Sequence, residues 1–199
     1  HFIHADPSQH TTLENIQAHK AKSVILLTDP ESADSDAKNA LIALAIKHLE
    51  TEKKVDVYII SELENLDKKR HLMEAGVDEV ICNLDFNIGI IAQSALFKNM
   101  SQVYQQLLSY SNETNEIYFI PPGKYPAEFI GKDFPALAIM INEKRVNFDD
   151  NPLILLGIKQ GEDILLNPSK ANFSGLHLDD SLIIMAFQYI SEIRMKPKS

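Results

Sequence analysis

The chain has 199 residues, of which 45% are hydrophobic and 24% are charged, so it is long and apolar enough to bury one sizeable core or two modest ones. Its formal net charge is −9, which argues against nucleic acid as a partner, because phosphate backbones are bound by clustered Lys and Arg. The single cysteine, Cys82, lies in an apolar stretch and cannot close an internal disulfide. We therefore expect a buried thiol and a reducing compartment.

No apolar run approaches the roughly 18 residues that a membrane span needs. The N-terminal stretch also lacks the basic-then-apolar order of a signal peptide. We therefore expect a water-soluble chain, which could still be the cytoplasmic part of a membrane protein.

The first half of the chain alternates short apolar runs with helical patterns. A helix is expected to begin at Asp34 or Ser35, which can cap it, and to run to about residue 50. Two shorter helices are predicted over 11–21 and 67–76, and strands over 2–4, 23–27, 55–61 and 78–81. Strands and helices in this alternation predict a parallel sheet with crossover helices, which is an α/β layer.

From Asn87 to Leu108, apolar residues recur every three or four positions and predict a single apolar stripe along a long helix. Asn99 and Ser101 could divide it into two helices. Two interpretations stay open on the residues alone. The helix is either a crossover or interface element between two differently built halves, or it packs on its own sheet.

The second half of the chain is β-rich and follows a polar linker at 109–116. Strand patterns occupy 116–122, 152–169 and 178–187, with a mixed segment between the first two. Gln160, Gly161 and Glu162 predict the turn of a β-hairpin.

The sequence contains none of the familiar catalytic signatures: no glycine-rich dinucleotide or Walker loop, no paired-cysteine motif and no serine nucleophile elbow. We therefore predict a protein that is not an enzyme. Three histidines, His1, His4 and His10, lie close together near the N-terminus, but nothing in their spacing fixes a ligand set. We expect them to be surface or partly buried residues.

Acidic residues follow two of the predicted strands, where ligands of parallel sheets bind. Glu62 and Glu64 are two positions apart on a strand, so their carboxylates lie on one face, roughly 7 Å apart. Calcium, which takes six to eight oxygen ligands, would offset their repulsion. The alternative is a solvated loop. In the other loop, Asp34 and Asp36 also fit the cap and first turn of a helix, and capping is favoured for Asp36.

The order of these segments resembles the RCK domains, the regulators of potassium conductance, also described as TrkA-N and TrkA-C type. The resemblance covers nearly the whole chain and is most specific at 4–7 (HADP), 74–81 (EAGVDEVI) and 156–168 (LGIKQGEDILLNP). It implies an incomplete Rossmann-like subdomain at 1–86, a helix-turn-helix crossover at 87–112 and a small β-rich α+β subdomain at 113–199. The family's first strand, glycine-rich turn and helix have no counterpart in this sequence.

The same resemblance implies ligands. Calcium-gated prokaryotic members use two glutamates that match Glu62 and Glu64, with an aspartate for which Asp29 is the counterpart. Asp34 matches an aspartate of the large-conductance calcium-activated channels, but Asn39 stands where a second one is expected. For NAD or an adenine nucleotide, the matching positions are Asp6 and Thr28, although the glycine-rich turn is absent from this chain.

The resemblance also implies a role as the cytoplasmic gating-ring domain of a potassium channel. Such domains form homodimers through the crossover helices and C-terminal subdomains, assemble as octamers, and act on a membrane pore. Calcium is the favoured ligand and a nucleotide the second. The alternatives are the nucleotide-binding subunit of a potassium transporter, a fragment of an NAD-dependent oxidoreductase, and an interaction module without a ligand.

Overall fold

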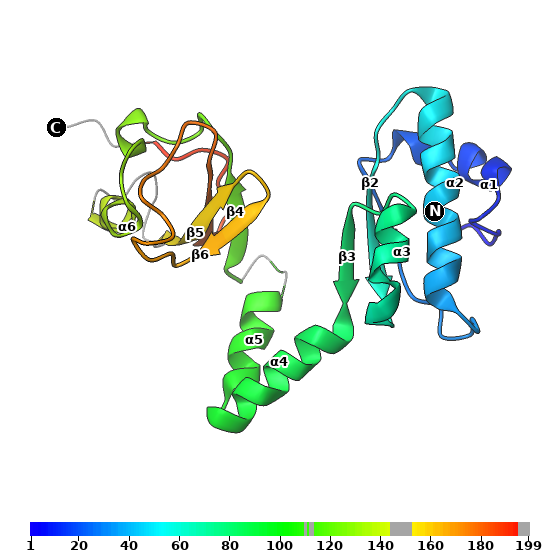
Figure 1. Cartoon of the computed structure of the whole chain (residues 1–199), viewed down its shortest axis with the longest axis horizontal. Coiled ribbons are helices and arrows are strands. Elements are labelled where there is room, and N and C mark those ends of the chain that lie inside the picture. The colour runs from blue at the N-terminus through cyan, green and yellow to red at the C-terminus, as the bar shows by residue number, and fades with distance from the viewer. Residues whose placement is uncertain (110, 112–113, 144–152, 195–199) are drawn as a thin grey trace. The chain divides into compact units, whose positions relative to one another are not determined.

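The computed structural model of the chain describes residues 1–109, 111, 114–143 and 153–194. The chain divides into two compact units, His1–Lys98 and Asn99–Ser199, and Figure 1 labels many of their helices and strands. No helix in the described part of the chain combines the length and apolar character that crossing a membrane requires.

The first unit contains a parallel three-stranded sheet, as the alternation of strands and helices predicts. Its strands are β1 (Ser23–Leu26), β2 (Tyr58–Leu63) and β3 (Glu79–Cys82), in the order β1-β2-β3. The helices are α1 (His10–Asn15), α2 (Ser35–Lys53) and α3 (Lys69–Glu74), with short 3₁₀ turns η1 (Ala18–Lys20) and η2 (Leu66–Lys68). The α/β prediction is confirmed.

The helices of this unit pack on one face of the sheet, because alternate strand residues point to one side. On β2, Ile59 and Leu63 are buried in a cluster with Ile46 and Leu49 of α2 and Leu72 of α3. Cys82 joins the same cluster, as expected of a buried thiol. The opposite face of the strands remains open, and apolar side chains such as Ile25, Tyr58 and Ile81 are exposed there.

Two predictions for the N-terminal segment are wrong. Residues 2–4, expected as a strand, have no regular structure, and none of the strands in the described part of the chain pairs with them. A short extended segment without a partner has no ladder to stabilise it. The expected helix over 11–21 is divided, because Gln17 adopts a left-handed conformation (φ 59°) between α1 and η1.

The long helical stretch forms two helices, α4 (Asn83–Leu96) and α5 (Met100–Leu108). The break falls at Asn99, as predicted, where the backbone is left-handed (φ 68°). Neither helix contains a buried residue.

The second unit contains an antiparallel four-stranded sheet of order β4-β7-β5-β6. Its strands are β4 (Glu116–Ile120), β5 (Ile154–Gln160), β6 (Asp163–Leu166) and β7 (Ser181–Ala186). The predicted hairpin joins β5 to β6, and Gly161 supplies the positive φ (58°) that its turn requires.

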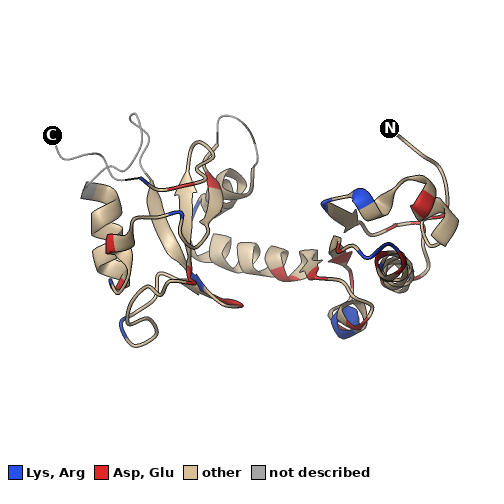
Figure 2. Cartoon of the chain, turned by 90° about the horizontal axis from the view of Figure 1, so that it is seen from above, with Lys and Arg blue, Asp and Glu red and all other residues tan. Residues whose placement is uncertain are grey.

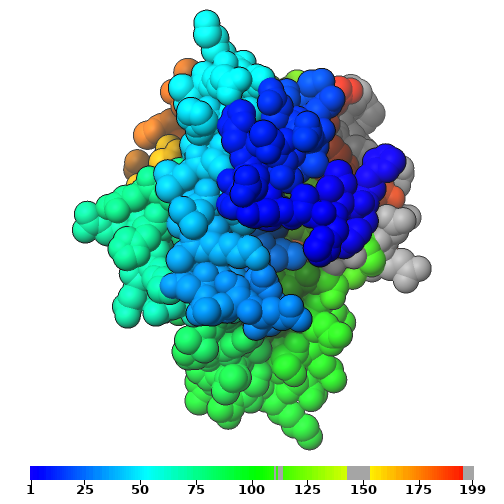
Figure 3. All heavy atoms as spheres, turned by 90° about the vertical axis from the view of Figure 1, so that its right-hand side faces the viewer, coloured from blue at the N-terminus to red at the C-terminus, as the bar shows by residue number. Residues whose placement is uncertain are grey.

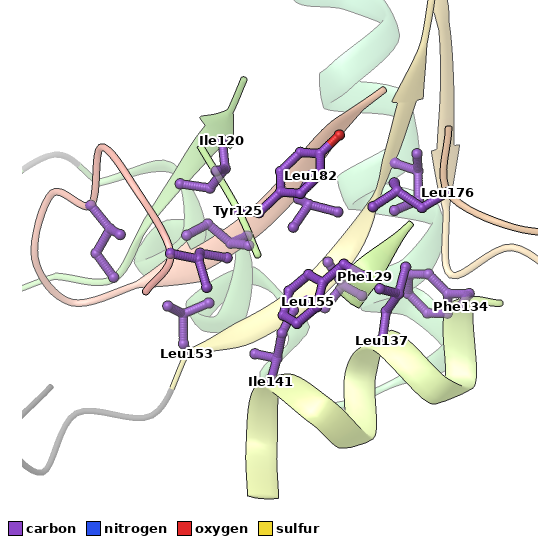
Figure 4. Packing of buried hydrophobic residues seen from close by; sticks show 14 of the residues in the cluster. Ile120, Tyr125, Phe129, Phe134, Leu137, Ile141, Leu153, Leu155, Leu176 and Leu182 are labelled. Atoms are coloured by element: carbon purple, nitrogen blue, oxygen red, sulfur yellow. The ribbon is translucent and has the colours of Figure 1, made fainter. Parts of the chain in front are cut away.

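The core of the second unit lies between this sheet and α6 (Phe134–Glu143), which the mixed segment forms together with η3 (Ala127–Phe129). Figure 4 shows Leu137 and Ile141 of α6 pointing toward the strand residues Leu155 and Leu182. Phe129 is fully buried in the same cluster. This unit therefore has its own core.

Candidate functional site

The carboxyl ends of the three parallel strands bring together residues that are far apart in the sequence. Thr28 follows β1, Glu62 lies near the end of β2, and Asn83 follows β3 as the first residue of α4. In open parallel sheets this edge is where ligands bind. We therefore take it as the candidate site.

The carboxylate of Glu62 accepts hydrogen bonds from both Thr28 and Asn83. Its Oε2 accepts hydrogen bonds from the backbone N–H of Thr28 (2.8 Å) and from the Thr28 hydroxyl (2.7 Å). Its Oε1 accepts a hydrogen bond from the side-chain amide of Asn83. The Thr28 N–H, the Thr28 hydroxyl and the Asn83 amide hold the pKa of Glu62 below its ordinary value, the N–H most strongly. The carboxylate is therefore ionised at neutral pH and joins the ends of three strands.

Glu64 has an exposed side chain, and its backbone N–H donates to Oδ1 of Asp36 at 3.0 Å. The N–H of Asn65 donates to Oδ2 of the same carboxylate, also at 3.0 Å. Asp36 does occupy the first turn of α2, but the expectation that it serves as a helix cap is wrong. Its carboxylate, only 3% exposed, ties α2 to the end of β2.

Asp34 is the N-cap of α2, one of the two residues expected there, and its Oδ1 accepts from the N–H of Ala37 at 3.0 Å. The same oxygen accepts from Nζ of Lys68 at 2.7 Å, and this bond is the main reason that the pKa of Asp34 is lowered. Asp34 is thus already paired with a cation.

Asp29 is also paired. Its Oδ2 lies 2.7 Å from Nζ of Lys38, and its Oδ1 accepts from the N–H of Glu31 at 3.0 Å. The bond to Lys38 comes first among the causes that lower the pKa of Asp29.

The four predicted calcium ligands therefore lie along one edge of the sheet. Glu62, Asp29 and Asp34 are bonded to other residues of the chain, and the side chain of Glu64 is exposed. In the described part of the chain, Glu62, Glu64, Asp29 and Asp34 do not form a group of three ligand atoms within 4.8 Å of one another. The calcium assignment stays a prediction.

Of the two residues suggested for a nucleotide, Asp6 lines a hollow to which Thr28 does not contribute. Oδ1 of Asp6 accepts from the N–H (2.9 Å) and hydroxyl (2.7 Å) of Ser8, and the first of these bonds most lowers its pKa. The hollow has a volume of about 810 Å³ and also includes Asp34 and Lys38. It lies where the N-terminal segment meets α2, and Figure 3 shows this segment in dark blue beside α2 in lighter blue.

Sequence reasoning named Asn39 only as a replaced calcium ligand and missed that polar side chains support this edge. Asn39, buried on α2, donates to the carbonyl of Leu27 (3.3 Å) and to the hydroxyl of Ser61 (3.4 Å). Asn83 was also missed, although it directly follows a predicted strand. The rule that ligands bind at the carboxyl ends of parallel strands, which selected Glu62, could have found it. Figure 2 shows acidic residues, in red, in both units.

The sheet, its helices and this polar edge define an α/β domain of the Rossmann-like kind. Residues 1–83 match the model of the TrkA-N domain family. The resemblance to RCK domains is therefore confirmed for the TrkA-N part of the chain, residues 1–83.

Several solved structures are similar to the chain. The GsuK channel is 18% identical, with 93% of this chain and 29% of that one covered and a TM-score of 0.42. The GsuK channel bound to NAD is also 18% identical, with 93% of this chain and 29% of that one covered and a TM-score of 0.39. The GsuK RCK domain is 18% identical, with 93% of this chain and 35% of that one covered and a TM-score of 0.36. The chain thus spans about a third of the length of these proteins. No curated protein matches it.

Proposed function

We propose that this chain is a ligand-sensing regulatory domain of the RCK type, which acts on the cytoplasmic side of a potassium channel by binding rather than by catalysis. The TrkA-N match over residues 1–83 supports the class. The favoured ligand is calcium, bound at the carboxyl edge of the sheet, and a nucleotide is the second candidate.

The observation that carries this proposal is the double attachment of Glu62. One of its oxygens holds Thr28 and the other holds Asn83, the first residue of α4. A cation that takes Oε1 competes with the Asn83 amide, so occupancy of the edge changes how the start of α4 is held. Ligand binding is thereby coupled to the predicted crossover helix.

The charges around the edge are compatible with calcium. Asp29 and Asp34 are paired with Lys38 and Lys68 through partly exposed side chains, and such ion pairs contribute little. A divalent cation with six to eight oxygen ligands can therefore displace them. Glu64, exposed two residues beyond Glu62, would then be free to turn toward the ion.

The hollow that Asp6 lines favours the second candidate, a nucleotide. Its volume of about 810 Å³ is within the range of small-molecule sites, roughly 300–1,000 Å³. Asp6 can accept hydrogen bonds from ribose hydroxyls, and Lys38 supplies a positive charge beside it. A nucleotide there would also fit the alternative role as the regulatory subunit of a potassium transporter.

Assembly through α4 completes the proposal. Leu84, Ile88 and Ile91 lie at spacings of four and three, on one face of the helix, and each is more than half exposed. A continuous exposed apolar surface marks an interaction site. We assign it to a homodimer and, through further contacts, to an octameric gating ring under a membrane pore. Several modest sites in a ring can supply the roughly 5.5 kcal/mol that shifts a gate from mostly closed to mostly open.

Calorimetric titration with CaCl₂ tests the ligand. We expect heat of binding in the wild type and none in the double variant Glu62→Gln with Glu64→Gln. The variant Glu79→Gln is the matched control, because Glu79 begins β3 at the opposite end of the sheet. Calcium binding that persists unchanged in the double variant would rule out this calcium site.

Titration with NAD and with ADP tests the second candidate. Heat that is lost in Asp6→Asn but kept in Asp56→Asn, which changes an exposed aspartate that does not line the hollow, would favour the nucleotide over calcium. Absence of binding heat with both NAD and ADP would exclude these nucleotides as the ligand.

Sedimentation velocity tests the assembly. Ile91→Glu places a charge on the apolar face of α4 and is expected to shift the protein toward the monomer. Gln93→Glu introduces the same charge at an exposed polar position of that helix and should leave assembly unchanged. A dimer that survives Ile91→Glu would exclude α4 as the interface.

A further inference from the structure

A second cluster of ionisable side chains lies where α1 meets α2. His10 is the first residue of α1. His48 and Glu52 are four positions apart on α2, so they lie on the same face of that helix. One ligand atom from each of the three residues lies within 4.8 Å of the others. In the described part of the chain, this is the only such group of three.

The geometry within the cluster is close. Nε2 of His10 lies 3.0 Å from Oε2 of Glu52, and the rings of His10 and His48 meet edge to face with centroids 5.5 Å apart. Nε2 of His10 is shielded from solvent and makes no hydrogen bond of acceptable geometry. The 3.0 Å approach therefore brings two potential ligand atoms together, and it is an ion pair only when His10 is protonated.

We propose that His10, His48 and Glu52 bind Zn²⁺, or a related divalent transition metal, with water as the fourth ligand. Two imidazole nitrogens and a carboxylate oxygen are a donor set that zinc accepts in a tetrahedral site. Adjacent ligand atoms of such a site are roughly 3.3 Å apart, given bonds of about 2.0–2.1 Å, which is close to the His10–Glu52 separation. Calcium is excluded as the occupant, because it takes oxygen ligands.

Neighbouring residues support the carboxylate. Oε1 of Glu52 accepts a hydrogen bond from Nζ of Lys53 at 3.2 Å, and the same Nζ lies 2.5 Å from Oε1 of Glu14 on α1. The charge of Lys53 is balanced by Glu14 and Glu52. Partners of this kind orient metal ligands.

The metal would fasten α1 to α2. With six residues, α1 is too short to be a stable helix alone. A metal bound between the two helices would fix α1 and, with it, the preceding loop that carries Asp6. The site is separate from the calcium and nucleotide sites proposed above, and it stands or falls independently of them.

Two alternatives to a defined metal site involve the same side chains or their neighbours. In the first, a protonated His10 forms a simple ion pair with Glu52, and no metal binds. In the second, the exposed histidines at the N-terminus, His1 and His4, collect zinc without a fixed ligand set. The stoichiometry of zinc binding distinguishes the first alternative from the metal site, and substitution of His4 distinguishes the second.

The test begins with protein treated with a chelator. Zinc is titrated against a colorimetric indicator, and cobalt is added to record the absorption bands of a four-coordinate ion. We expect one ion per chain in the wild type. The variants His10→Gln, His48→Gln and Glu52→Gln should each weaken zinc binding at least about tenfold, since even the loss of a supporting partner weakens metal sites by 10–100-fold.

The matched controls are His71→Gln, which changes an exposed histidine on α3, and His4→Gln. Both should bind zinc like the wild type. Zinc should also raise the midpoint of thermal unfolding of the wild type and both controls, but not that of His48→Gln. Because His48 is exposed, this variant should fold like the wild type, and circular dichroism checks that it does. Zinc binding that is equally strong in His48→Gln, or weakened as much by His4→Gln, would overturn the proposal.

Discussion

The backbone N–H of Glu64 donates a hydrogen bond to Oδ1 of Asp36 at 3.0 Å, across 28 positions of sequence. The N–H of Asn65 donates to Oδ2 at the same distance. A single buried carboxylate on α2 thus satisfies two successive N–H groups where β2 ends. The path of the loop that carries Glu64 depends on this carboxylate.

Replacing Asp36 by Ala should therefore destabilise the first unit. Both N–H groups lose a charged acceptor in a site that is 3% exposed, and hydrogen bonds to charged groups contribute about 1.5–3 kcal/mol each. We expect a loss of about 2–4 kcal/mol in the free energy of unfolding, allowing for partial access of water to the loop. Urea unfolding followed by circular dichroism measures it.

Two variants calibrate the result. Asp36→Asn keeps one acceptor oxygen and should lose less stability than Asp36→Ala. Asp56→Ala removes an exposed aspartate and should change the free energy of unfolding by no more than about 0.5 kcal/mol. Equal unfolding midpoints for Asp36→Ala and Asp56→Ala would show that the two hydrogen bonds contribute nothing.

Local patterns in the sequence predicted most of the elements. Buried strands such as β2 are recognisable because they are short, apolar and rich in β-branched residues. The break at Asn99 and the turn at Gly161 were predictable because few residue types tolerate a positive φ. The prediction of a strand at 2–4 was wrong, because a short apolar run forms a strand only beside a partner strand, which the local sequence does not reveal.

The site was only partly predictable. The rule that ligands bind at the carboxyl ends of parallel strands indicated Glu62, and the resemblance to RCK domains indicated Thr28. The structure places these two residues in direct contact. The partners of Asp36 and the meeting of His10 with Glu52 depend on how α2 packs against the sheet and against α1. Those contacts join residues 28 to 42 positions apart, beyond the reach of spacing rules within one element.

The hydrogen bonds of Glu62 predict a dependence of stability on pH. Thr28 lowers the pKa of Glu62 in the folded chain below the ordinary value of 4.5. The unfolded chain therefore binds a proton at Glu62 at a higher pH than the folded chain does. The stability that this carboxylate contributes is complete above its unfolded pKa and is lost as the pH falls through the lower, folded pKa.

Glu62→Gln removes this titration. The free energy of unfolding of the wild type should fall more steeply between about pH 5 and pH 3 than that of the variant, so the difference between them narrows in acid. Glu31→Gln, at an exposed glutamate of the neighbouring loop, should follow the wild type throughout. Curves for wild type and Glu62→Gln that stay parallel over this range would contradict the assignment.

Gly157 is the position in the second unit where the absence of a side chain matters most. It lies in β5 at an irregularity of the pairing with β7. A Cβ added there would lie 2.3 Å from the carbonyl oxygen of Leu165 on β6, which is backbone and cannot move aside alone. Gly157→Ala should therefore lower the free energy of unfolding by about 1–3 kcal/mol through overpacking.

Gly89→Ala, on α4 with nothing within 4 Å of the added Cβ, should instead be neutral or stabilise the chain by up to about 1 kcal/mol. Urea unfolding of both variants decides the matter, and a Gly157→Ala variant as stable as the wild type would mean that the two strands can separate there without loss.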